Sequence, residues 1–206
     1  MTIVGILNGG KYMDQNFQNH KEKLRQQIEE QLGKLVYTYE THLKNADFLQ
    51  QDNKRFKWIQ IILSAISASG FIATVITDQA KLAWLGGVIS ILLLVINGYL
   101  KDKDFSAEQK KHRDTANLLW SIREDYYSLL TDLDSLTVGE VMNKRDKLKE
   151  KTAKVYATAP QTDARSYKAA QQALKVEEAQ CFAAGELNML LPAHLQHDVV
   201  DKENRR

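Results

Sequence analysis

The 206-residue chain has one cysteine, two prolines and almost no excess charge. The single Cys181 excludes an internal disulfide and suggests a reducing compartment. The formal net charge is only +2, and basic residues are interleaved with acidic ones throughout. No face therefore has the basic character of a nucleic-acid-binding surface, the basic run at 110–113 is interpreted as a solvated helix face, and we predict no direct binding of nucleic acid.

Motifs for catalysis and cofactor binding are also missing. The sequence contains no Gly-rich phosphate loop, no GxSxG, no HExxH and no paired cysteine ligands. His194 and His197 could lie on one side of a helical turn, but two histidines are a weak metal signal. His112 lies at an apolar position of its helical pattern and is interpreted as a hydrogen-bonded interface residue. We predict a protein that is not an enzyme, holds no cofactor or metal, and acts through binding, assembly or a change in a membrane.

Two long apolar runs dominate what the sequence does contain. Residues 59–77 and 82–100 carry no charged side chain, and each run is 19 residues long. A helix of that length spans about 28 Å, close to the ~30 Å hydrocarbon core of a bilayer. We predict a transmembrane helical hairpin over residues 58–100, with helices at 58–77 and 82–100 and the lipid bilayer as a partner.

The sequence before the hairpin predicts a short N-terminal segment, 1–15, and one amphipathic helix over 16–57. The segment lacks the basic start of a signal peptide. In the helix, apolar residues recur every three or four positions, and no proline interrupts them. They are Leu24, Ile28, Leu32, Leu35, Tyr39, Leu43, Ala46 and Leu49. A helix this long needs packing partners along its length, from the same chain or from a second copy.

Charges beside the runs predict the orientation of the hairpin. Basic residues precede the first run at 54, 55 and 57 and follow the second at Lys101 and Lys103, whereas the connecting loop offers only Lys81. The excess of positive charge on the cytosolic side of membrane proteins then places both termini in the cytoplasm. Trp58 and Tyr99 fall at the cytosolic ends of the runs, where amphipathic rings favour the headgroup level.

Weakly polar residues within the hairpin gather on particular helix faces. The polar stripe of the first run comprises Gln60, Ser64, Ser67, Phe71 and Thr74, and a small-residue seam of Ala65, Ser69 and Ala73 lies opposite it. On the second run, Gly86, Ser90, Leu93 and Asn97 share a face. In an antiparallel hairpin that turns near residues 78–79, residues whose numbers sum to 157 lie at equal depth, so Gln60 faces Asn97 and Ser67 faces Ser90.

Two interpretations of these stripes remain open. Ser, Gly and Asn are common where membrane helices pack, so the matched faces could simply hold the hairpin together. Alternatively, the first-run stripe faces the axis of an oligomer and lines a pore, with Phe71 as an apolar constriction. Both interpretations are compatible if only one of the two stripes packs the two helices of the hairpin together.

The sequence after the hairpin predicts a cytosolic helical region, 101–195, and a solvated tail, 196–206. Apolar spacing predicts a helix over 105–134, and Thr137-Val-Gly-Glu140 has the form of a capping box that starts the next helix. A last helix is expected from Asp163 to about Met189, after a linker that contains Pro160. The expected fold is an all-α membrane protein with a two-helix transmembrane hairpin and a cytosolic bundle of long helices.

The arrangement of these segments resembles the SLATT family, two-transmembrane effectors of bacterial conflict systems. The resemblance covers about residues 20–195. It rests on the hairpin at 58–100, the stretch Phe105-Ser-Ala-Glu-Gln-Lys-Lys-His-Arg-Asp-Thr-Ala116, Ala159-Pro160 followed by Tyr167-Lys-Ala-Ala170, and the ending Glu186-Leu-Asn-Met-Leu-Leu-Pro192.

The resemblance implies an antiviral defence effector of the bacterial inner membrane. Such a homo-oligomer stays inactive until a partner senses infection, then perforates or depolarises the membrane and causes abortive infection. The implied partner is a sensor, or an enzyme that makes nucleotides or nucleic acid, encoded by a neighbouring gene. An alternative of another class is a membrane-anchored scaffold that conducts nothing and recruits a cytosolic partner through its helices.

Overall fold

The computed structural model describes residues 3–77, 80–183 and 185–196. Within these ranges, the side chains of residues 3–17, 71, 73–77, 80–83 and 193 lie outside the description. The chain forms two compact units, Met1–Ala170 and Gln171–Arg206. The hairpin and the helical bundle both belong to the first unit.

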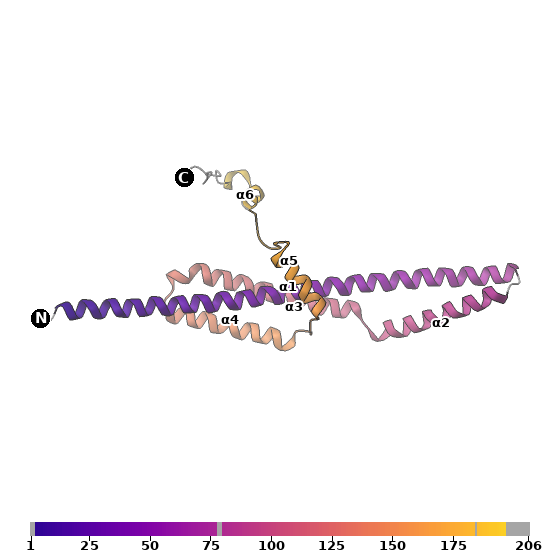
Figure 1. Ribbon diagram of the computed structural model, residues 1–206, viewed down its shortest axis with the longest axis horizontal. Helices are drawn as coiled ribbons and strands as arrows, with labels where there is room; N and C mark the ends of the chain where they lie inside the picture. The colour runs from indigo at the N-terminus through magenta and orange to yellow at the C-terminus, as the bar shows by residue number, and fades with distance from the viewer. Residues whose placement is uncertain (1–2, 78–79, 184, 197–206) are drawn as a thin grey trace. The chain divides into compact units, whose positions relative to one another are not determined.

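The first unit is organised around one very long helix, α1, which runs from Ile3 to Thr77 (Figure 1). Its 75 residues correspond to about 110 Å of helix. We expected an amphipathic helix to start near residue 16 and a membrane helix to follow it from residue 58. The structure instead has a single helix that includes Asn8-Gly-Gly10, because a glycine weakens a helix by only about 1 kcal/mol and does not break it as proline does.

The remaining elements are also helical. They are α2 (Ala80–Asp102), α3 (Phe105–Asp132), the 3-10 turn η1 (Leu133–Ser135), α4 (Val138–Thr158), α5 (Ala164–Lys175), α6 (Glu186–Leu190) and the 3-10 turn η2 (Ala193–Leu195). The predicted all-α class is confirmed for the residues that the structure describes. The predicted capping box at the start of α4 is also confirmed: the Thr137 hydroxyl accepts from the Glu140 amide, while the Glu140 carboxylate accepts from the Thr137 amide.

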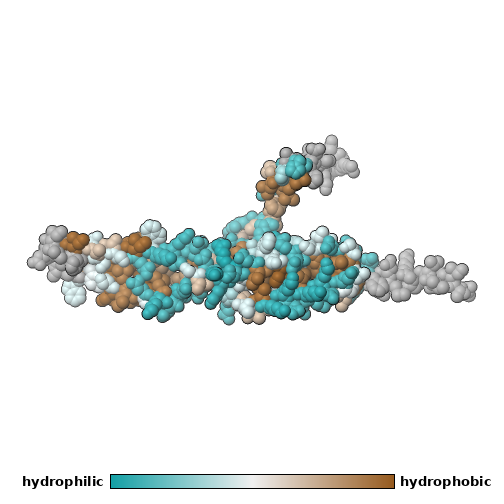
Figure 2. All heavy atoms as spheres, turned by 180° about the vertical axis from the view of Figure 1, so that it is seen from behind, coloured by the Kyte–Doolittle hydropathy of each residue, from teal (hydrophilic) through white to brown (hydrophobic). Residues whose placement is uncertain are grey.

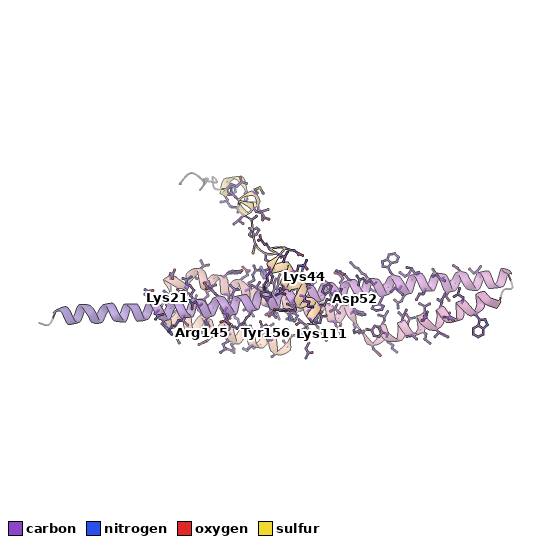
Figure 3. All side chains as sticks on the ribbon, viewed as in Figure 1. Lys21, Lys44, Asp52, Lys111, Arg145 and Tyr156 are labelled. Carbon is purple, nitrogen blue, oxygen red and sulfur yellow. The ribbon has the colours of Figure 1, made fainter. Side chains whose placement is uncertain are left out.

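Contacts between side chains give the direction of each helix along α1. Arg113 on α3 pairs with Asp47 at 2.8 Å, and the later residue Asp134 pairs with the earlier Arg25 at 2.9 Å, so α3 runs antiparallel to α1. On α4, Arg145 donates to Gln27 and Tyr156 donates to Thr38, so α4 runs parallel to α1. Figure 3 shows the same order, with Lys21 and Arg145 far from the hairpin and Asp52 near it.

Three helices therefore enclose the main core, in which the N-terminal half of α1 packs against α3 and α4. The cluster comprises Leu24, Ile28, Leu32, Leu35, Leu119, Ile122, Tyr126, Leu129, Leu133, Val141 and Leu148. Four of these were predicted from the spacing in α1. The C-terminal half of α1 packs instead against α2 (Figure 1).

The expected last helix over 163–189 is wrong. The helix α5 ends at Lys175, and the chain then turns through two non-glycine residues with positive φ, Glu178 at 49° and Gln180 at 70°. The amide of Ala179 bonds back to the Ala173 carbonyl at 2.9 Å, which satisfies one end group of α5. Gly185, with φ of 83°, precedes the short α6.

Candidate functional site in the hairpin

A continuous heptad ridge links the helical bundle to the hairpin. Buried or half-buried residues recur along α1 at alternating intervals of four and three positions, and within the bundle further residues between them are covered as well. This heptad ridge comprises Ile28, Leu32, Leu35, Tyr39, His42, Ala46, Leu49, Asn53, Phe56, Gln60, Leu63, Ser67 and Gly70. A repeat of seven keeps one face of a helix turned toward its partners along the whole length. The face of α1 that contacts α3 is therefore in phase with the face that contacts α2.

The partner side of the hairpin shows the same spacing. On α2, Gly86, Ile89, Leu93, Ile96 and Leu100 are the buried or half-buried residues among those described. They follow intervals of three and four, so the two helices pack through facing seams. Gly86, Ser90, Leu93 and Asn97 were all predicted on this face. Gly86 and Leu93 do lie on it, whereas Ser90 and Asn97 lie at its border and are exposed.

Hydrogen bonds cross the hairpin at two of the expected levels. The Gln60 amide donates to Oδ1 of Asn97 at 2.6 Å, and the hydroxyls of Ser67 and Ser90 are 3.2 Å apart. The Ser90 hydroxyl also donates to the Gly86 carbonyl at 2.9 Å. Gln60 and Ser67 therefore each have a hydrogen-bond partner within one hairpin.

Other predicted site residues point elsewhere. Ser64 is exposed, and so are Ala65 and Ser69 of the small-residue seam. The Ser69 hydroxyl donates to the Ala65 carbonyl within its own helix at 2.8 Å. The side chains of the remaining three members, at positions 71, 73 and 74, lie outside the described residues. The described part of the small-residue seam is thus left uncovered by α2.

The outer surface of the hairpin is strongly apolar. Among the described residues, a stretch long and apolar enough to cross a membrane lies within Trp84–Ser135, a range that begins in α2; this stretch has mean hydropathy 1.6 and is 6% buried. On α1, Ile61 and Ile62 are also exposed. Figure 2 shows hydrophobic side chains over the hairpin and hydrophilic ones where it meets the bundle. Such exposure of apolar surface requires a lipid or protein covering.

A buried polar layer separates the apolar core from the hairpin. It comprises Glu40, Thr41, His42, Asn45, His112, Thr115 and Ser166. Here α1 is covered on more than one side, because the start of α5 packs on it: Tyr167 stacks on Tyr37, and the Arg165 guanidinium lies 3.7 Å from the centre of the Phe48 ring. Burial on several faces is why residues between the apolar positions are also removed from water.

The centre of this layer is a pair of histidines. Nδ1 of His42 and Nδ1 of His112 are 2.8 Å apart, which requires one ring to donate and the other to accept. The prediction that His112 is a hydrogen-bonded interface residue is confirmed. His42 was missed, although the interval of seven from Leu35 would have placed it on the heptad ridge.

The surroundings of the pair favour neutral rings. Burial, together with the neighbouring His112, lowers the pKa of His42 to about 4. Burial also lowers the pKa of His112, although Glu108 and Asp163 act in the opposite direction. Near neutral pH the pair is therefore an uncharged hydrogen bond between α1 and α3.

The fold thus defines a class of all-α proteins in which an apolar two-helix hairpin extends from a helical bundle. Residues 24–186 match the model of SMODS and SLOG-associating 2TM effector domain family 4. The match covers well over half of the chain, which belongs to this family, and the resemblance to SLATT proteins is confirmed. No curated protein and no solved structure matches the chain. The family is one of two-transmembrane effector domains, which agrees with the apolar hairpin.

Proposed function

We propose that this protein is an effector of a bacterial anti-phage conflict system that oligomerises and perforates or depolarises the inner membrane when a partner triggers it. The observation that carries this proposal is the heptad ridge, which joins the bundle and the hairpin on one unbroken helix. A change of packing in the cytosol can then turn or shift the membrane half of α1. The family name, which couples the domain to SMODS and SLOG, supports a partner encoded nearby.

The hydrogen bonds of the hairpin suggest what a resting state looks like. Gln60 and Ser67 are members of the proposed pore lining, yet they bond to Asn97 and Ser90. We propose that activation rotates α1 relative to α2, so that the polar stripe Gln60, Ser64, Ser67, Phe71 and Thr74 faces an oligomer axis. Water in the open path would replace the lost bonds. Because the stripe carries no formal charge, the path would be weakly ion-selective.

An oligomer also needs a surface on which hairpins can meet. The small-residue seam offers one, because Ala65 and Ser69 are exposed and allow close approach of another helix. Packing at such surfaces relies on contact and hydrogen bonding, since lipid tails are as apolar as leucine. We propose that Ala65, Ser69 and Ala73 contact a neighbouring subunit while Gly86, Ser90 and Asn97 hold the hairpin.

The proposed orientation has both termini in the cytoplasm of the bacterial cell. Lys57, Lys101 and Lys103 line one pocket, so the basic residues on either side of the hairpin lie at the same end. The excess of positive charge favours the cytosolic side for this end. The bundle would then meet a cytosolic partner directly.

The conduction path is tested by expressing variants without the trigger and recording membrane potential and growth. Phe71→Ser should depolarise the cells, because it removes the apolar constriction of the stripe. In cells where the unaltered protein is activated, Ser64→Leu should abolish depolarisation, because leucine would make the path apolar and narrower at this position. Ser64 is exposed and makes no bond across the hairpin in the described structure, so a loss of hairpin bonds would not explain the result.

The matched control is Ile66→Leu, which keeps size and polarity on an exposed apolar position. It should behave like the unaltered protein at equal membrane abundance. If Phe71→Ser and Ser64→Leu also do so, the polar stripe only packs the hairpin and does not conduct.

A membrane-anchored scaffold is the second candidate, and exposed apolar residues in the second unit favour it. Val176, Phe182, Met189 and Leu190 are all at least 60% exposed, a pattern typical of a surface that another protein covers. A scaffold would recruit its partner through this unit and leave the membrane intact. Capture of a partner without any depolarisation, in cells where the system is triggered, would favour the scaffold.

A further inference from the structure

The junction between hairpin and bundle contains a pocket that neither the pore nor the core explains. While α1 is continuous here, the opposite side of the hairpin breaks: α2 ends at Asp102 and α3 begins at Phe105. The break leaves a pocket of about 390 Å³, within the range of small-molecule sites. It is lined by Asn53, Lys57, Gln60, Leu100, Lys101, Lys103, Asp104, Phe105 and Ser106.

Positive charge dominates the lining of this pocket. Lys57, Lys101 and Lys103 contribute three ammonium groups against the single carboxylate of Asp104. That carboxylate already accepts from the amide of Ala107 at 2.9 Å as the cap of α3. Among the residues that the structure describes, none of the three lysines forms an ion pair, whereas Lys34, Lys44, Lys151 and Lys154 of the bundle each do.

Aromatic rings hold the break in a defined shape. Phe56 lies 5.9 Å from Tyr99 and 5.6 Å from Phe105, measured between ring centres. Nζ of Lys103 is 5.6 Å from the centres of both the Tyr99 and Phe105 rings, so cation–π attraction positions it. Asn53 donates to the Ser106 hydroxyl at 3.2 Å across the same junction. The pocket is therefore built between fixed elements.

The level of the pocket relative to the membrane indicates the source of its ligand. Gln60 and Leu100 of the lining belong to the ends of the two apolar runs, and Trp58 and Tyr99 nearby are 65% and 50% exposed. Exposed Trp and Tyr at the ends of apolar helices mark the headgroup level of a bilayer. A pocket at this level meets phosphate groups of the inner leaflet, with an apolar wall on the side where acyl chains begin.

We propose that this pocket binds the phosphate of an anionic phospholipid headgroup in the cytosolic leaflet. Basic pockets at the cytosolic ends of membrane helices bind such headgroups through charge and hydrogen bonds. Lys57, Lys101 and Lys103 would contact the phosphate, and Asn53 and Ser106 would offer hydrogen bonds at its edge. A lipid bound here joins α1 to the α2–α3 break and so stabilises the junction. This proposal does not depend on conduction through the hairpin.

The test is native mass spectrometry of the full chain in mild detergent, titrated with phosphatidylglycerol or phosphatidylcholine. The unaltered protein should bind the first phosphatidylglycerol at least about tenfold more tightly than phosphatidylcholine, since each lysine near anionic lipid contributes roughly fivefold. The pocket variant combines Lys57→Gln, Lys101→Gln and Lys103→Gln and should lose this preference. The control variant, with Lys54→Gln, Lys110→Gln and Lys111→Gln, removes equal charge from exposed positions outside the pocket and should keep it.

A further arm separates lipid from soluble phosphate. Millimolar inorganic phosphate should leave phosphatidylglycerol bound, because the acyl chains add apolar contacts that the ion lacks. The proposal is overturned if the two triple variants lose the preference equally, if the unaltered protein shows no preference, or if inorganic phosphate displaces the lipid completely. Thermal unfolding in the same detergent checks that both variants remain folded, as expected for substitutions at exposed side chains.

Discussion

The two halves of the heptad ridge on α1 follow one spacing but contain different residues. From Ile28 to Ala46 the ridge is mostly apolar and buried against the bundle, whereas from Gln60 to Gly70 it is half-buried and, apart from Leu63, small or polar. In water, burial of apolar surface drives helices together, and large side chains contribute most. In lipid that driving force is absent, so small residues and hydrogen bonds take over. One helix thus uses the same seven-residue repeat to pack against partners in water and in lipid.

The first prediction compares equivalent truncations in the two halves. Leu35 is 1% exposed, so Leu35→Ala should reduce the free energy of unfolding by about 2–5 kcal/mol through lost burial and a cavity. Leu63→Ala, on the hairpin part of the ridge, should cost clearly less, because only packing is lost in lipid. Equilibrium unfolding of the full chain in mixed detergent measures both.

Leu94→Ala is the control for the first prediction, since Leu94 is 72% exposed on the outer face of α2. It should change the free energy of unfolding least of the three. Equal losses for Leu35→Ala and Leu63→Ala would contradict the idea that the two halves are stabilised by different forces.

The second prediction concerns the boundary between the halves, where His42 contacts His112. The pKa of His42 falls from 6.5 to about 4 on folding, so the folded protein binds fewer protons than the unfolded chain between these pH values. Stability is therefore fully present above pH 6.5 and decreases as the pH falls toward 4. The loss should reach up to about 3 kcal/mol, because one pKa unit corresponds to 1.36 kcal/mol.

The matched variant for this prediction combines His42→Leu with His112→Leu. It should show a smaller loss of stability over the same pH range, since carboxylates still titrate but the buried imidazoles are gone. His20→Gln, at an exposed position, should behave like the unaltered chain. If the double variant keeps the full pH dependence of stability, groups other than these two histidines cause it. Chemical unfolding followed by circular dichroism at several pH values provides the comparison.

How much of the fold and of the candidate site could be predicted from the sequence differs along the chain, for physical reasons. Apolar spacing located the core at Leu24, Ile28 and Leu35, because burial in a soluble bundle selects apolar residues directly. The hydrogen bond of Gln60 with Asn97 follows from equal depth, since α1 ends at Thr77 and α2 begins at Ala80, which restricts the register of the two helices. His42 was missed because polar residues at core positions do not register as apolar periodicity, although their spacing is the same.

Other features depended on tertiary structure or on competing local preferences. The end of α5 at Lys175 could not be predicted, because no glycine or proline directly follows it and Glu178 and Gln180 adopt positive φ instead. The pocket at the α2–α3 break was also missed. Lys101 and Lys103 were recognised only as topology signals, and their approach to Lys57 depends on how the hairpin folds back.

The last prediction addresses the hydrogen bonds that distinguish the membrane half. Gln60→Leu removes the donor to Asn97, and such bonds between membrane helices average about 0.6 kcal/mol in double-mutant cycles. The cycle with Asn97→Leu should give a coupling of that size, measured by unfolding in mixed detergent.

If the bond holds the resting hairpin, its loss shifts the equilibrium toward the active form by roughly threefold, since 1.4 kcal/mol is a factor of ten. Depolarisation in untriggered cells should rise slightly for Asn97→Leu, which removes the same bond without changing the polar stripe, and stay unchanged for the control Ile66→Leu. A coupling near zero would mean that this bond does not contribute to holding the hairpin at rest, and the Ser67–Ser90 bond and the packing of the two helices would then have to do so.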